Sequence, residues 1–128
     1  MSDFVDPTDH LAVEQVLIGC LSALGPAAVL AQLSAVLPVR LGHAGGLFRA
    51  AVPTVVGEGE ELLSIPSEGR PRLQHIVGGV VLSSDDVPPR ELPGTLAALL
   101  MRALARSGQY DDAAVLLTAL RDAVAAGR

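Results

Sequence analysis

The sequence predicts a single α+β domain in which a helical pair, a three-stranded antiparallel sheet and a C-terminal helical hairpin follow one another. Three observations predict it. Apolar residues recur at helical spacings near both ends of the chain, the middle alternates with the period of strands, and turns rich in Gly and Pro separate the segments. The expected order is α-α-β-β-β-α-α. A chain of 128 residues fits one domain, 1–128, in which we expect 1–6 to be a flexible N-terminus.

Two helices are expected before the sheet. The stretch Asp6-Pro7-Thr8-Asp9 has the capping residues and the proline of a helix start. The apolar residues behind it form one stripe: Val13, Val16, Leu17, Cys20, Leu21 and Leu24. After Gly25 and Pro26 a second helix, 27–37, is apolar nearly all round and therefore needs cover on more than one side. Its candidate subunit-interface residues are Val29, Leu33 and Val36.

Three strands are expected in the middle of the chain, at 48–56, 61–65 and 73–82. Pro53 cannot donate to a sheet ladder, so the first strand should lie at an edge or carry a bulge. From Ile76 on, both alternating sets of the third strand are mostly apolar, so its second half should be buried on both faces. Gly78 and Gly79 inside it would then admit a helix or a second subunit, which makes both of them candidate interface residues. Valine at either position is expected to overpack.

Two more helices, 96–105 and 111–125, are expected after Pro93-Gly94, with a break at Ser107-Gly108. Within 96–123, four residues stand at spacings similar to the turn glycine, aromatic, small and bulky positions of a repeat: Gly108, Tyr110, Ala113 and Leu117. The segment thereby resembles one tetratricopeptide helix pair, over about a quarter of the chain. The resemblance implies two antiparallel helices packed closely at Ala113. Ala97 departs from the tryptophan-like position, and a lone repeat does not imply peptide binding.

The composition indicates self-association. Half of the residues are apolar and only 18% are charged, which is an unusually apolar composition for a small soluble domain. A small monomer must cover a large surface with polar groups. We therefore expect part of the apolar surplus to lie in a homo-oligomeric interface, most simply that of a dimer. The alternative is a very apolar monomer.

Charge and motifs exclude several classes of function. A net charge of −5 without arginine clusters or aromatic platforms argues against nucleic acid and anionic membranes. No apolar run reaches the roughly 18 residues of a spanning helix, and no signal-peptide pattern is present. The lysine-free composition, rich in Ala, Gly and Val, is typical of a GC-rich bacterial genome, and we expect a cytoplasmic protein. The single cysteine, Cys20, lies on an apolar stripe, and no metal or cofactor is expected.

Arg72 and His75 are the candidate ligand-binding residues. A histidine inside a strand can act as a general base or contact a ligand, although it more often makes one structural hydrogen bond. Arg70 and Arg72 could receive a carboxylate or pair with acids of the neighbouring turns. Adjacent residues Asp85 and Asp86 point apart, which favours turn capping over acid–base chemistry.

These observations favour a non-catalytic cytoplasmic protein that acts as a homo-oligomeric interaction, chaperone-like or regulatory module, with a protein partner as a further option. One alternative is a small-ligand-binding protein with an apolar pocket between sheet and helices, gated by Arg72 and His75. A second alternative is a small acid–base enzyme that uses His75 with Asp85 or Asp86.

Overall fold

The computed structural model describes residues 4–53 and 59–127 of the chain. The helices are α1 (His10–Leu24), α2 (Pro26–Leu33), α3 (Leu92–Ser107) and α4 (Tyr110–Ala126), with a 3₁₀ turn η1 (Pro89–Glu91) before α3. The strands are β1 (Arg40–Ala44), β2 (Leu47–Pro53), β3 (Gly59–Pro66), β4 (Arg72–Val77) and β5 (Val80–Asp86). The α+β class is confirmed. The prediction of three strands is wrong, because the described residues form a five-stranded antiparallel sheet.

Both additional strands come from pairs of glycines that make hairpin turns. Gly45 and Gly46 join β1 to β2 with φ values of 60° and 76°, and β1 lies between the expected helix 27–37 and the expected strand 48–56, where no strand was expected. Gly78 and Gly79, with φ of 58° and 79°, divide the expected strand 73–82 into β4 and β5. Two consecutive residues with positive φ are typical of a type I′ turn, which glycine adopts without steric penalty.

The strands lie in chain order, β1-β2-β3-β4-β5, so each pairs only with its neighbours along the chain. Pro53 is therefore on an inner strand, which corrects the expectation of an edge. It sits at the end of β2 opposite Glu60, beyond the point where β1 begins opposite Ala51, so its missing N–H interrupts no bond to β1. The expected strand residues 54–56 and the turn residues 57–58 lie outside the described residues.

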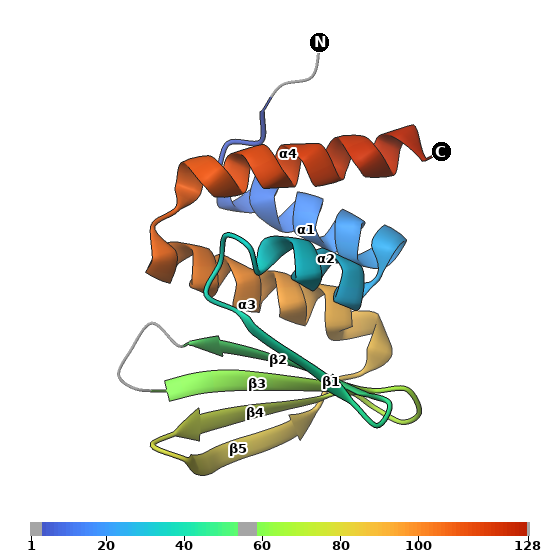
Figure 1. The fold of residues 1–128 in the computed structure, drawn as a ribbon, viewed down its shortest axis with the longest axis vertical. Helices are drawn as coiled ribbons and strands as arrows, with labels where there is room; N and C mark the ends of the chain where they lie inside the picture. Colours follow the sequence, from blue (N-terminus) through green and yellow to red (C-terminus); the bar gives the residue numbers. More distant parts are fainter. Residues whose placement is uncertain (1–3, 54–58, 128) are drawn as a thin grey trace.

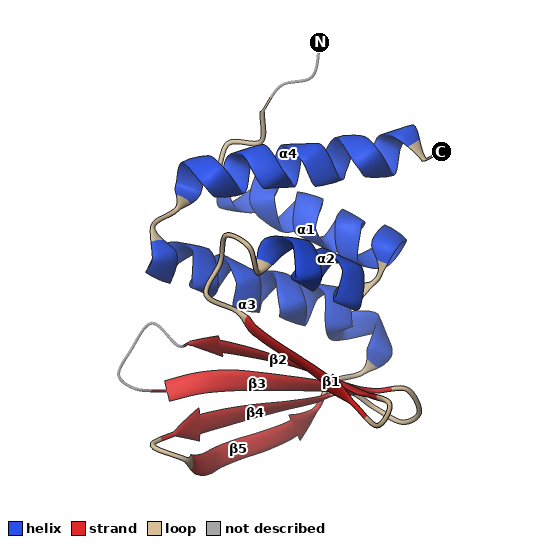
Figure 2. Cartoon of the chain, in the orientation of Figure 1, coloured by secondary structure: helices blue, strands red, loops and turns tan. Residues whose placement is uncertain are grey.

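All four helices stack on one side of the sheet (Figures 1 and 2). α3 lies nearest the strands, α4 is farthest, and α1 and α2 lie between them (Figure 1). α1 packs extensively against both α3 and α4, whereas α3 and α4 share few direct contacts. Ala113 is buried, but the tetratricopeptide-like packing of the two C-terminal helices on each other is wrong, because the N-terminal helices separate them.

The helix ends follow ordinary capping rules. Asp9, rather than Asp6, caps α1 and accepts a hydrogen bond from the backbone N–H of Ala12 at 3.2 Å. α3 begins at Leu92, four residues earlier than expected, because Pro93 falls in its first turn, where no N–H is needed. At its other end Gly108 adopts the left-handed conformation that terminates a helix.

The core lies between the helices and the inner part of the sheet. Its fully buried large side chains are Val13, Val29, Leu30, Leu33, Val52, Leu63, Leu96, Leu99 and Leu100. The N-terminal segment joins this core: Val5 is 4% exposed, and its N–H donates to the Thr118 hydroxyl of α4 at 2.9 Å. The expectation of a flexible segment that includes Val5 is thus wrong, since the chain is held there, and residues 1–3 lie outside the described residues.

Candidate interaction surface

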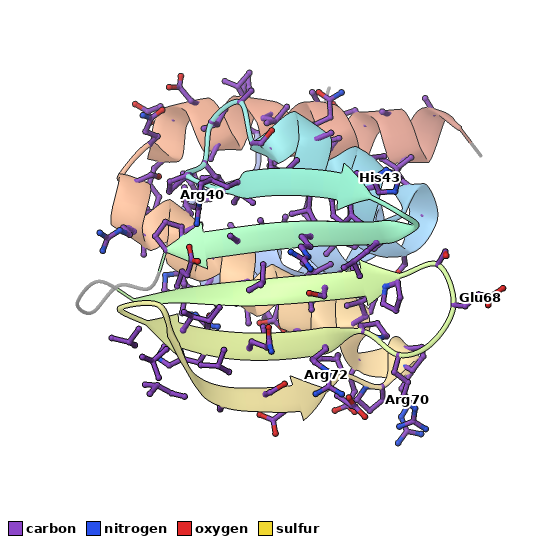
Figure 3. All side chains as sticks on the ribbon, turned by 60° about the horizontal axis from the view of Figure 1, so that its bottom comes forward. Arg40, His43, Glu68, Arg70 and Arg72 are labelled. Atoms are coloured by element: carbon purple, nitrogen blue, oxygen red, sulfur yellow. The ribbon has the colours of Figure 1, made fainter. Side chains whose placement is uncertain are left out.

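The sheet has one face toward the helices and one open face, which Figure 3 shows from the front. Ala50 and Leu63 are opposite each other in β2 and β3 and are fully buried, which identifies the helix side. Leu63 is opposite Leu73 of β4. Because side chains alternate along a strand, Leu73, His75 and Val77 share the helix side, whereas Arg72, Gln74 and Ile76 share the open face.

Arg72 and His75 consequently lie on opposite faces of the sheet and do not converge on one pocket. Within the open face, Arg72 binds its own hairpin: its guanidinium donates to the Ser84 hydroxyl at 2.9 Å and lies 3.1 Å from the Asp86 carboxylate. Arg70 lies near the same end of the sheet and extends away from the strands (Figure 3). The Arg72 side chain is therefore already paired with residues of the neighbouring strand, β5.

The acid–base alternative lacks an assembled pair in the described residues. Asp85 and Asp86 are strand residues at the end of β5, not turn caps, which corrects the sequence-based interpretation. Asp86 is opposite Arg72, and Asp85 is opposite Leu73, on the same face as half-buried His75. Among the hydrogen bonds and ion pairs of the described residues, none joins His75 to Asp85.

The residues proposed for a subunit interface fall into two groups. Val29 and Leu33 are at most 1% exposed within the single chain, so a second copy could reach them only if the chain opened; α1 and α4 cover the helix that carries them. Val36 is partly buried against the same core. Gly78 and Gly79 are in an exposed turn, where an added Cβ meets no atom within 4 Å. No helix of the described chain therefore comes close to these glycines, and a valine at either position is not expected to overpack within the single chain. A place for Gly78 and Gly79 in a subunit interface stays a prediction.

The feature that the sequence analysis missed is an exposed apolar cluster on the β4–β5 hairpin. It consists of Val77, Val80, Val81 and Leu82, which are 38%, 59%, 49% and 61% exposed. We call these four residues the hairpin patch. They account for half of the exposed large apolar side chains in the described parts of the chain. The sequence signal was present, since a two-residue glycine pair between β-branched runs predicts a hairpin.

The hairpin projects away from the helices (Figure 1). β5 forms one edge of the sheet, and all seven of its residues are exposed. A register shift between β4 and β5 leaves Leu82 as the extra residue of a bulge, since His75 is opposite Ser83 and Ile76 is opposite Val81. An uncovered edge strand presents unpaired backbone groups, and an adjoining apolar patch is typical of an interaction site.

The helical part of the chain contains apolar grooves. One, of about 480 Å³, lies between α1 and α4, and its walls include Val16, Gly19, Cys20 and Val124. Neither Arg72 nor His75 lines this groove. The Cys20 side chain is 2% exposed, and burial raises the pKa of its thiol. Such a thiol is not activated as a nucleophile.

Across residues 4–53 and 59–127, no cluster of His, Cys, Asp and Glu side chains has the arrangement of a metal site. Within the same residues, no helix combines the length and the apolar character needed to cross a bilayer. Comparisons of the chain with protein-family models, with curated proteins and with solved structures gave no match.

Proposed function

We propose that the protein is a non-catalytic interaction module, in a homo-oligomeric, chaperone-like or regulatory role, and that it binds its partner through the hairpin patch and the β5 edge. The composition supports a cytoplasmic bacterial setting for this role. One observation carries the proposal: half of the exposed large apolar residues in the described parts of the chain lie together on the β4–β5 hairpin, beside a strand edge that no helix of the described chain covers.

Two physical effects would favour binding at this place. Covering apolar surface contributes roughly 25 cal/mol per Å² removed from water. A partner strand would also supply hydrogen bonds to the outward backbone groups of β5, as in recognition by strand addition. The polar half of β5 limits the extent of the contact, because its acids, Asp85 and Asp86, favour water over an apolar cover.

The two alternatives have weaker support. An apolar ligand would have to use a groove such as that between α1 and α4, since Arg72 and His75 do not share a pocket. Native mass spectrometry would detect a small molecule retained in that groove. An acid–base role would require His75 and Asp85 to meet, and no hydrogen bond or ion pair among the described residues joins them.

Site-specific photocrosslinking in living cells tests the proposal. A photoreactive phenylalanine analogue replaces Leu82 in the full chain, and a matched control carries it at Gly42. Gly42 is exposed on β1, the opposite edge of the sheet, and has open space at its Cβ. We expect discrete adducts from position 82, none from position 42, and loss of the adducts when Val81→Glu is added.

The charge of Val81→Glu lies on an exposed side chain, so the fold should persist, and far-ultraviolet circular dichroism of the variant checks this. Equal adduct yields from the two edges, or no adduct from position 82, would contradict the proposed docking surface.

A further inference from the structure

We infer that the partner of the hairpin patch is a second copy of this chain, paired antiparallel along β5 about a two-fold axis through Val81. This inference rests on the proposed function and identifies its partner. The two sheets would then form one continuous sheet of ten strands, twice the five of one chain.

Symmetry restricts how two β5 strands can pair. Opposite residues of an antiparallel pair lie on the same face of the sheet. A two-fold axis perpendicular to the sheet also leaves every side chain on its original face. Both conditions hold only if the axis passes between two copies of the same residue. The choice of register thus reduces to the choice of one central residue in Val80–Asp86.

Val81 is the centre that matches apolar residues with apolar residues. Val81 is then opposite Val81 of the partner subunit, and Val80 is opposite Leu82 of the partner subunit. A centre at Leu82 or Ser83 would instead place both valines opposite serines or aspartates. The latter arrangement brings apolar side chains against Asp86, whose carboxylate pairs with Arg72 in the hairpin. With Val81 central, the acids of each copy extend past the partner's turn into water.

The backbone selects the same residue. Val77 and Val80 flank a two-residue turn, and in such hairpins the flanking residues exchange backbone hydrogen bonds with each other. The next pair, Ile76 and Val81, does not, so the N–H and C=O of Val81 point outward from the sheet edge. Two copies meeting at Val81 would exchange both bonds. The bulge at Leu82 disturbs the alternation beyond this point and keeps the pairing short.

Both faces of the sheet would gain apolar contact. Val80 is opposite Val77 on the helix side, and Val81 is opposite Ile76 on the open face. Because only a few residues of β5 would pair, we expect the contact to bury less than the roughly 800 Å² per partner of a standard interface. We therefore expect a reversible dimer whose population rises with protein concentration.

Cysteine trapping tests the register. Val81→Cys places one thiol of each copy beside the axis. The Cα atoms of the two opposite residues would lie within the 4.4–6.8 Å that a disulfide needs, so mild oxidation should give a covalent dimer. Ser84→Cys is the control, because three residues on either side of the axis separate its thiols by about 20 Å. The native Cys20 is 2% exposed and should not react. A dimer trapped by Ser84→Cys and not by Val81→Cys would overturn the register.

Light scattering behind a sizing column, over a dilution series of the native protein, tests the partner. The mass should rise from 13.1 kDa toward twice that value as concentration increases. Val81→Arg should remain at 13.1 kDa throughout, with an unchanged circular dichroism spectrum.

A native protein that stays monomeric at every concentration would overturn the second copy as partner. If position 82 then crosslinks to another protein, the proposed function stands and only the inference of a second copy falls. If position 82 gives no adduct either, both the proposed function and the inference are wrong.

Discussion

Replacing Gly78 with alanine tests why the β4–β5 hairpin turns where it does. The residue has a φ of +58°, and a Cβ built on it meets no atom within 4 Å. The added methyl group therefore contacts no neighbouring atom, and any loss of stability should come from the backbone conformation alone. The left-handed conformation is unfavourable by roughly 1–2 kcal/mol for a residue with a Cβ. We expect Gly78→Ala to lower the free energy of unfolding by about that amount.

Gly78→Asn separates backbone strain from crowding. Asparagine is larger than alanine but adopts the left-handed region more readily, and Asn-Gly is a favoured pair in this type of turn. Strain predicts that the asparagine variant is more stable than the alanine variant, whereas crowding predicts the reverse order. Gly42→Ala provides the matched control, because Gly42 also has open space but no positive φ. Its free energy of unfolding should change by no more than about 1 kcal/mol.

Urea denaturation, followed by circular dichroism, measures the free energy of unfolding of the three variants, at protein concentrations low enough to keep the protein monomeric. A loss of 1 kcal/mol should lower the melting temperature by about 3–5 °C in a chain of this size. Hydrogen exchange at the β5 amides should show the same ranking locally. An asparagine variant less stable than the alanine variant would refute the strain argument and return Gly78 to a crowded environment.

Other substitutions and one labelling experiment test the core. Leu63→Ala removes a fully buried side chain and should cost about 2–5 kcal/mol in urea denaturation, clearly more than Leu62→Ala on the open face; equal losses would contradict the assigned faces. Thr118→Val leaves the buried N–H of Val5 without an acceptor and should lower the free energy of unfolding by about 1–3 kcal/mol. Thr118→Ser keeps a hydroxyl acceptor and should retain most of the native stability. Because burial raises the pKa of the Cys20 thiol, a reagent that reacts with thiolates at pH 8–9 should label Cys20 only after denaturant is added, and rapid labelling of the native protein would contradict its burial. The thiol ionises at lower pH in the unfolded state than in the folded state, so the free energy of unfolding should fall as pH rises through the ordinary thiol pKa.

The helices could be predicted from the sequence because each buries a continuous stripe that local spacing reveals. The positions of α1 and α4 follow from such stripes and from the breaks at Gly25 and Gly108. The strand count could not be obtained from alternation alone. A pair of glycines such as Gly78-Gly79 fits either a weakened strand or a two-residue turn, and only the pairing partners decide between them.

The interaction surface was harder to predict, because exposure depends on how far the helical layer extends. Residues 80–82 are as apolar as a buried strand, and their exposure follows from the position of β5 beyond the helices. The opposite error arose at α2. Its all-round apolar surface indicated a subunit interface at Val29 and Leu33, but α1 and α4 of the same chain cover that surface.

The position of α1 between α3 and α4 has a consequence during synthesis. The ribosome releases α1 and α2 before it makes α3 and α4, the helices that cover them. Until Leu92–Ala126 emerges, the side chains of Val13 and Leu30 have no complete core to enter, although the hairpins of the sheet pair only with neighbours and can form early. The nascent chain thus carries uncovered apolar helices until α3 and α4 have emerged, a stage at which binding by a general chaperone would protect it.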